Sequence, residues 1–171
     1  MQWTTDRTSF DRQVLDNLAV LQRFAVRLTG DLDRAEELSQ ETLLRATRAW
    51  ETYRGRSQFR TWLYQIAVNV FRDGLRKRPP PVELPDGLVD AGAAPPAAGA
   101  ETSERGEVIA RAVSSLPPRQ REVIVLHTFE QLSVPEVAQT LGITEVNVRA
   151  QLTYARRKLK ELLAPYLDSI T

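Results

Sequence analysis

The chain has no cysteine, which excludes disulfide bonds, thiolate metal sites and cysteine nucleophiles together. It has one histidine, His127, in the largely apolar stretch REVIVLHTFE. Because no second candidate ligand lies nearby, a packed core histidine is favoured over a metal ligand. We expect no metal site and no cofactor. No arrangement of a nucleophile with a base is evident either, so an enzyme is not predicted.

Long hydrophobic runs are also missing. No stretch approaches the roughly 18 uninterrupted apolar residues of a membrane span. The first residues, MQWTTDRTSFDRQ, lack the basic segment and the apolar run of a signal peptide. The sequence therefore predicts a cytoplasmic protein that is not inserted in a membrane.

Net charge is small, +1 over 171 residues, but the charges are segregated along the chain. Residues 31–41 hold five acids and one base, a net charge of −4. Residues 51–78 hold seven bases and two acids, a net charge of +5. Because local patches determine which partner is attracted where, this pattern indicates two partners of opposite charge.

A segment rich in alanine, proline and glycine divides the chain. Residues 78–103, RPPPVELPDGLVDAGAAPPAAGAETS, have no hydrophobic periodicity and cannot bury enough apolar surface to offset the entropy lost on ordering. We therefore predict a flexible tether between domains at 8–77 and 104–165. No alternating strand pattern occurs. The expected fold is all-α, with two small helical domains and a helix-turn-helix in the second.

Helical periodicity and capping signals locate seven helices. They are expected near residues 10–29, 32–50, 58–77, 104–115, 118–130, 133–141 and 145–163. Asp31, Ser57 and Thr144 are expected to cap the helices that follow them, and Ser133 with Glu136 makes a capping box.

The last two helices have the pattern of a helix-turn-helix, in which TLGIT supplies the turn and Gly142 can take a positive φ. The apolar stripe of the second helix comprises Val148, Leu152, Ala155, Leu159 and Leu163. Its other face comprises Arg149, Thr153, Arg156, Arg157 and Lys160. Such a helix enters the major groove of duplex DNA, and its basic side chains contact phosphates. A solvated basic helix is the alternative, but turn, caps and basic face together favour DNA.

The helix before the tether, SQFRTWLYQIAVNVFRDGLRKR, carries a second polar face. Its expected core residues are Phe59, Leu63, Ile66, Ala67 and Val70. Its opposite face comprises Trp62, Gln65, Asn69, Arg72 and Arg76. Aromatic rings stack on unpaired bases, amides bond base edges and arginines follow phosphates, so this face indicates single-stranded DNA. The alternative is that Trp62 is a partly buried core residue and the arginines only add solubility.

The helix AEELSQETLLRATRAW has an acidic face. Glu37, Gln40, Glu41, Leu44 and Arg48 lie opposite Ala35, Ser39, Leu43, Ala46 and Trp50. An exposed leucine among acids and an amide suggests a protein contact. Acids in a first helical turn also complement the helix dipole, so the two interpretations stay open.

Together these segments resemble a known family. AEELSQETLLRATRAW and YRGRSQFRTWLYQIAVNVFRDGLRKR, followed by LPPRQREVIVLHTFEQLSVPEVAQTLGITEVNVRAQLTYARRKL, are similar to the extracytoplasmic-function group of bacterial RNA polymerase sigma factors. The resemblance covers nearly all of the chain apart from the tether. It implies a subunit that binds core RNA polymerase and directs it to promoter DNA, with an anti-sigma factor as a further partner. It also implies that the tether runs toward the RNA exit channel.

The resemblance assigns roles to particular residues. It implies that Glu37, Gln40, Glu41 and Leu44 dock on the β′ clamp helices of the polymerase, whose β flap is a further contact. It implies that the minus-ten element is melted and held by Tyr53, Arg54, Arg56, Ser57, Trp62, Gln65, Asn69, Arg72 and Arg76. It implies that the minus-thirty-five element is bound by Thr144, Asn147, Arg149, Ala150, Thr153, Tyr154, Arg156, Arg157 and Lys160.

The last helix departs from the usual pattern of the family. Where the family often has a serine, an arginine and a further basic or aromatic residue, this chain has Ala150, Gln151 and Thr153, and Tyr154 stands where an arginine is frequent. A sigma-like decoy that sequesters an anti-sigma factor without binding DNA is the alternative function. Such a decoy could discard the basic faces, which this chain keeps. A response-regulator effector does not explain the first half, which has no βα alternation.

Overall fold

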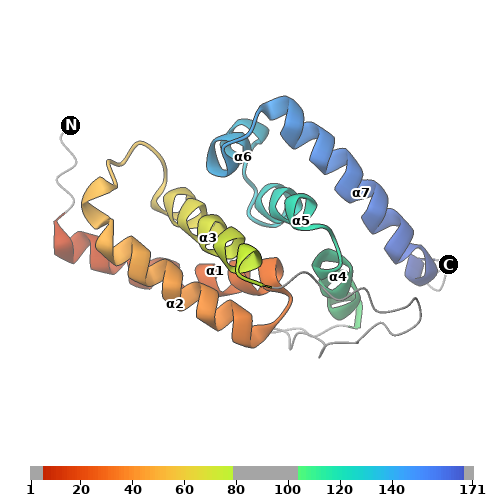
Figure 1. Ribbon diagram of the computed structural model, residues 1–171, viewed down its shortest axis with the longest axis horizontal. Helices are drawn as coiled ribbons and strands as arrows, with labels where there is room; N and C mark the ends of the chain where they lie inside the picture. Colours follow the sequence, from red (N-terminus) through yellow and green to blue (C-terminus); the bar gives the residue numbers. More distant parts are fainter. Residues whose placement is uncertain (1–5, 79–103, 168–171) are drawn as a thin grey trace.

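The computed structural model describes residues 6–78 and 104–167, and in these two ranges it contains helices and no strand (Figure 1). The first domain consists of α1 (Arg7–Thr29), α2 (Leu32–Arg48), the short 3₁₀ helix η1 (Trp50–Thr52) and α3 (Phe59–Arg76). The second consists of α4 (Glu104–Ser114), α5 (Pro118–Ile124), the π-helical turn η2 (Val125–Phe129), α6 (Val134–Leu141) and α7 (Glu145–Leu167). The all-α prediction is confirmed. Residues 79–103 of the predicted tether lie outside the described residues.

Local signals start most helices close to the predicted positions, but α1 begins at Arg7, capped by Asp6, rather than near residue 10, and the cap of α3 also differs. The side chains of Asp31 and Thr144 each accept a hydrogen bond from the backbone N–H three residues on, at 2.9 and 3.2 Å. The prediction that Ser57 caps α3 is wrong, because Gln58 holds the N-cap position and makes no side-chain capping bond. The carbonyl of Ser57 instead accepts a hydrogen bond from the Tyr53 hydroxyl at 2.8 Å. This hydrogen bond therefore joins the two ends of the loop before α3.

Two predicted helix ends are corrected. The helix expected over 118–130 is α-helical only to Ile124 and continues as the π turn η2, after which Gln131 has a positive φ of 59°. The helix expected to end near 163 runs to Leu167 and includes Pro165. A proline at this position removes the backbone donor that would bond the carbonyl four residues earlier, here that of Glu161. None of the helices in the described ranges is long and apolar enough to cross a membrane.

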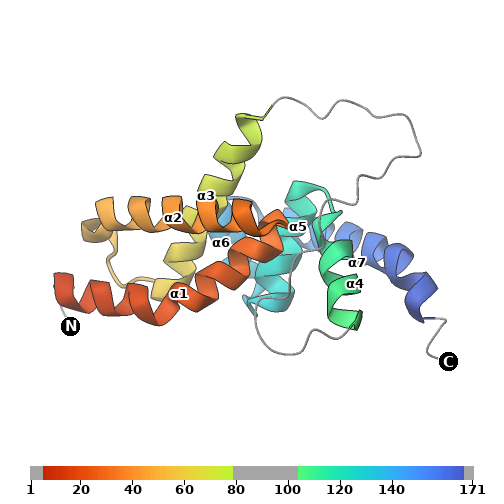
Figure 2. The same cartoon turned by 90° about the horizontal axis from the view of Figure 1, so that it is seen from below.

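Helix α3 is buried on two faces. Its buried residues are Phe59, Leu63, Tyr64, Ala67, Val68, Val70 and Phe71. The expected core stripe omitted Tyr64, Val68 and Phe71 and included Ile66, which is only half-buried. The reason is that α3 packs on α1 and α2 of its own domain and also on α6 of the second domain (Figure 2). Periodicity arguments assume one buried face, and α3 has more.

The two domains pack against each other, a point that the sequence leaves open. One cluster of buried apolar residues runs from Phe10 in α1 to Ala155 in α7. Helix α1 contacts α4 and α5, while α3 contacts α6 (Figures 1 and 2). At Gly30, whose φ is 68°, an added Cβ would lie 2.5 Å from the Cβ of Ser114. The absence of a side chain at this turn therefore lets the ends of α1 and α4 approach closely.

The capping box at the start of α6 is present and lowers an acid's pKa. The backbone N–H and the hydroxyl of Ser133 each lie 2.7 Å from a carboxylate oxygen of Glu136. The backbone N–H first, and then the hydroxyl, hold the pKa of Glu136 below its usual 4.5. A lowered folded-state pKa gives stability above the unfolded pKa, and this stability is lost as the pH falls through the folded value.

Replacing Glu136 by glutamine should therefore lower the free energy of unfolding at neutral pH by about 0.5–1 kcal/mol, a small value because the group is largely exposed. The difference from the parent should shrink as the pH falls below 4.5. Urea unfolding followed by circular dichroism at several pH values measures both quantities. Glu104→Gln, at an exposed position of α4, is the control. A difference that stays constant down to about pH 3 would contradict this account.

Candidate nucleic-acid interface

The inner face of α7 is anchored as predicted. Val148, Leu152 and Ala155 are buried against the second domain, where α7 packs on α4, α5 and α6. Leu159 and Leu163 are half-buried. The predicted turn is also present, because Gly142 has a φ of 66° and its N–H donates to the carbonyl of Ala138. The anchored stripe leaves the other faces of α7 free to bind.

The outer face of α7 lies at the edge of the molecule, away from α1–α3 (Figure 1). Its predicted DNA-binding residues are exposed apart from half-buried Ala150. They are Thr144, Asn147, Arg149, Thr153, Tyr154, Arg156, Arg157 and Lys160. A row of guanidinium and ammonium groups, with few polar side chains free to bond base edges, suits phosphate contacts.

Several of these side chains already have partners within α7. Arg149 pairs with Glu145 at 3.0 Å, and the Thr153 hydroxyl donates to the carbonyl of Arg149 at 3.0 Å. The guanidinium of Arg157 lies 5.5 Å from the centre of the Tyr154 ring. A hydroxyl bonded to its own helix is a weaker base reader, because its proton is engaged.

Sequence reasoning missed an apolar residue in the first turn of α7. Val146 is 75% exposed and stands beside Asn147 at the end of the helix that a helix-turn-helix presents to bases. Apolar side chains in that position contact the methyl group of thymine. The signal was available, because Val146 falls outside the apolar stripe of the helix.

On α3, Gln65, Asn69 and Arg76 are exposed, as expected for a polar face. Trp62 is not on a free face. Its ring lies 5.4 Å from Tyr53 and 5.4 Å from Phe59, and 6.2 Å from the ring of Phe10. The partly buried alternative is therefore the one observed, because the loop before α3 and the first turn of α1 surround the indole.

The loop from Tyr53 to Ser57 is held at its first residue. Tyr53 packs edge-on against Phe59, and burial raises the pKa of its hydroxyl. Arg54 and Arg56 are exposed, and Ser57 is half-buried. The aromatic cluster of Phe10, Tyr53, Phe59 and Trp62 thus presents two arginines on a fixed support beside α3.

Arg72 is the predicted DNA residue whose position differs most from expectation. Its Nε and one terminal nitrogen donate to the two carboxylate oxygens of Glu122 in α5, at 3.0 and 2.8 Å. The other terminal nitrogen donates to the carbonyl of Leu141 at 3.2 Å. The expectation of a free side chain is corrected, because the second domain covers this part of α3.

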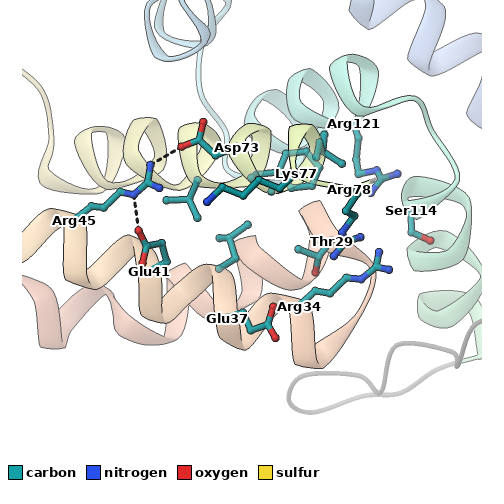
Figure 3. Close-up of a pocket in the computed structure, with 15 residues that line it drawn as sticks. Thr29, Arg34, Glu37, Glu41, Arg45, Asp73, Lys77, Arg78, Ser114 and Arg121 are labelled. Carbon is teal, nitrogen blue, oxygen red and sulfur yellow. Dashed lines mark hydrogen bonds and ion pairs between the residues drawn. The ribbon is translucent and has the colours of Figure 1, made fainter. Parts of the chain in front are cut away.

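The acidic face of α2 borders a groove of about 520 Å³ (Figure 3). Glu37 and Gln40 are exposed, and Leu44 is 44% exposed. Glu41 is tied into a chain of ion pairs. Arg45 pairs with Glu41 and with Asp73 of α3, each at 2.7 Å. Its hydrogen bond to Asp73, followed by that of Arg76, lowers the pKa of Asp73.

The far end of this groove is basic and reaches the second domain. Arg34 of α2 and Arg78 beyond α3 lie near Arg121 of α5 (Figure 3). Arg121 donates to the backbone carbonyls of Leu28 and Leu116 at 2.6 and 2.9 Å. Burial, and then the nearby charge of Arg34, lower the pKa of Arg121. The junction thus places acids on α2 beside cations from both domains.

Comparison with known proteins matches both domains separately. Residues 14–79 match the family model described as sigma-70 region 2, and residues 106–159 match sigma-70, region 4. The chain is 34% identical over 145 residues to the ECF RNA polymerase sigma factor SigM of Bacillus subtilis, covering 82% of this chain and 86% of SigM. The chain belongs to the ECF RNA polymerase sigma factors.

Relatives within the sigma-factor family differ in length. The ECF sigma factor SigG of Mycobacterium tuberculosis is 34% identical over 171 residues, covering 85% of this chain and 46% of SigG. The chain thus spans about half the length of SigG. Among solved structures, the sigma factor RpoE of Bartonella quintana, in complex with the anti-sigma factor NepR, has a TM-score of 0.71 at 24% identity. That alignment covers 92% of this chain and 98% of RpoE, and it supports the fold.

The region 2 match contains α2 and α3, and the region 4 match contains α6 and the part of α7 up to residue 159. The acidic face of α2 and the polar face of α3 therefore lie in region 2 of this sigma factor, and the basic face of α7 lies in region 4. His127 is an internal residue of region 4, half-buried, with its Nδ1 atom 2.8 Å from the carbonyl oxygen of Leu132. It is a packed core histidine, as expected.

Proposed function

We propose that the chain is a promoter-specificity subunit of RNA polymerase that catalyses no reaction itself. It binds the core enzyme, melts the minus-ten element and binds the minus-thirty-five element. The observation that carries the proposal is that one chain of this family holds two nucleic-acid faces of different chemistry. One face, on α3, combines exposed amides with arginine. The other, on α7, is a row of exposed arginine and lysine side chains.

The face on α7 suits intact duplex. Arg149, Arg156, Arg157 and Lys160 are exposed on a helix that is anchored from behind. Positive side chains on the second helix of a helix-turn-helix hold phosphates on either side of the major groove. The minus-thirty-five element is therefore bound mainly through its backbone, with Val146 and Asn147 as the base contacts.

The face on α3 suits a separated strand. Gln65 and Asn69 are exposed amides one helical turn apart, and an amide bonds the edge of an unpaired base. Arg54, Arg56 and Arg76 supply positive charge on either side of them. Trp62 supports this face from within the aromatic cluster, where its ring packs against Tyr53.

The acidic face of α2 suits a basic protein partner. Glu37, Gln40 and Leu44 are exposed together, so charge and apolar area are offered on one face. We assign this face to the β′ clamp helices of the core enzyme and a surface of region 4 to the β flap. An anti-sigma factor is a further partner, supported by the likeness to RpoE in its complex with NepR.

Reversing the charge of Glu37 should weaken binding to core polymerase roughly 10-fold, because a lysine there meets like charge on the partner. Glu37 is a cleaner choice than Glu41, which is paired with Arg45. The assay is competition between Glu37→Lys and the labelled parent for core enzyme. Asp16→Lys, at an exposed position of α1, is the control. Equal affinity of Glu37→Lys and the parent would move the docking face elsewhere.

The function as a whole is tested by reconstitution. The purified chain is added to core RNA polymerase with a library of promoter fragments, and specific transcripts are sequenced. Transcription from defined start sites that depends on the chain supports the proposal. Binding to an anti-sigma factor without binding to core enzyme or DNA would instead identify a decoy.

A further inference from the structure

The contact between Arg72 and Glu122 joins the two domains and is almost fully buried. Glu122 is 1% exposed and the side chain of Arg72 is 21% exposed. The guanidinium meets both carboxylate oxygens, at 3.0 and 2.8 Å, in the paired geometry that fits arginine best. Its other terminal nitrogen donates to the carbonyl of Leu141, in the last turn of α6. We call this contact the Arg72–Glu122 clamp.

A second acid forms a similar bridge nearby. The side chain of Glu130 is 6% exposed and pairs with Arg27 of α1 at 3.0 Å. Its other oxygen accepts a hydrogen bond from the hydroxyl of Tyr64 in α3. The guanidinium of Arg27 also lies 4.9 Å from the centre of the Phe129 ring. The second domain thus places two acids, Glu122 and Glu130, on cations of the first.

An interface that contains buried ion pairs is suited to opening. The attraction between buried charges is largely offset by the water that each lost, so a buried ion pair adds little net stability. When the domains separate, both partners regain their water. Interfaces between domains of one chain resemble those of transient complexes for the same reason.

The closed arrangement cannot place both DNA faces on one promoter. The minus-ten and minus-thirty-five elements are roughly 25 base pairs apart, which is about 85 Å of duplex at about 3.4 Å per step. Two touching domains of this size, each about 30 Å across, span roughly 60 Å. The 25 residues from 79 to 103 could extend to about 85 Å. Separation of the domains is therefore both required and permitted by the chain.

The two DNA faces differ in their exposure when the domains are packed together. The basic residues of α7 are exposed in the closed arrangement, and α7 itself lies at the edge of the molecule, apart from α1–α3 (Figure 1). On α3, by contrast, Arg72 is held by Glu122 and α6 packs against the same helix. Duplex contacts through α7 are thus available in the closed chain, whereas the arginine of the single-strand face is not.

We propose that Glu122 acts as an internal substitute for a DNA phosphate on Arg72, so that the single-strand face becomes complete only when the domains separate. A carboxylate and a phosphate both accept two parallel hydrogen bonds from one guanidinium, so they compete for it. Glu122 therefore both closes the chain and lowers its affinity for unpaired DNA in the absence of polymerase. This inference rests on the proposed function for the role of Arg72 and on the observed contacts for the clamp.

The first measurement concerns opening and needs no DNA. Because the chain has no cysteine, dyes can be placed on the single pair Asp16→Cys and Lys158→Cys, at exposed sites of α1 and α7. Glu122→Gln keeps the size of the side chain but removes its charge. The open fraction, measured by energy transfer between the dyes, should rise roughly 10-fold or more. Arg72→Gln should open the chain from the other side. Glu104→Gln should not. Unchanged energy transfer in both clamp variants would overturn the clamp.

The second measurement concerns the shared use of Arg72. A labelled 20-nucleotide single strand and the matching duplex are titrated with the full-length chain. Glu122→Gln should bind the single strand about 10-fold more tightly than Glu104→Gln, which removes the same charge, and should bind the duplex equally well. The double variant Arg72→Gln, Glu122→Gln leaves neither charge of the clamp unpaired and lacks the guanidinium, so it should lose the gain. A gain that persists in the double variant, or opening of Glu122→Gln with no gain, would overturn the competition. The transcription assay separately tests the proposed function.

Discussion

Removing the amide of Asn69 should impair promoter opening about 5- to 150-fold, while the closed complex forms with unchanged affinity. The side chain is exposed on α3, one turn from Gln65, on the helix that carries the proposed single-strand face. A contact to an unpaired base is worth about 1–3 kcal/mol and exists only after the strands separate. Asn69→Ala therefore removes a contact that is absent from the duplex-bound state.

Permanganate footprinting of the melted region, beside a gel shift on the same promoter, measures opening and binding separately. Gln22→Ala removes an exposed amide from α1 and should leave both unchanged. If Asn69→Ala opens the promoter as well as the parent at every temperature, the single-strand role of this face is wrong. Loss of both opening and duplex binding would mean that Asn69 acts earlier than proposed.

Neutralising Arg157 and Lys160 together should weaken duplex binding roughly 60-fold at 0.1 M salt. Both side chains are exposed on the outer face of α7, and neither is part of its buried stripe. Each phosphate contact releases about 0.9 counterion, so the loss of two contacts should reduce the salt dependence of log affinity by about 1.8. Binding measured over a range of salt concentrations gives both values from one series.

The sequence dependence of this loss distinguishes two roles. Phosphate contacts carry no sequence information, so Arg157→Gln with Lys160→Gln should weaken binding to promoter and unrelated duplexes alike. Arg12→Gln with Arg23→Gln removes the same charge from exposed sites of α1 and is the control. A loss confined to the promoter sequence would show that these side chains read bases.

The helices could be predicted from the sequence because their signals are local. The capping box at Ser133, the turn at Gly142 and the apolar stripe of α7 each depend on residues a few positions apart, and each is present. The free faces of α2 and α7 follow from the same periodicity. These are the parts of the candidate site that lie on helices with one buried side.

The errors occur where contacts join distant parts of the chain. Arg72 and Glu122 are 50 positions apart, and a helical wheel drawn for α3 alone contains no information about α5. Trp62 was placed on a polar face because the aromatic residues around it come from α1 and from the loop after η1. Only the packed arrangement shows that α3 is enclosed by both domains.

The π-helical turn η2 sets the direction in which Glu130 points. A π turn holds one residue more than an α turn, so every side chain after it is displaced by one position, or about 100° around the axis. Glu130 directly follows the five residues of this turn. Its alignment with Arg27 and Tyr64 therefore depends on the number of residues in the turn that precedes it. A single-residue deletion in this turn would rotate Glu130 away from both partners. Domain closure would then be altered by a change in helix register, although every contacting side chain is still present.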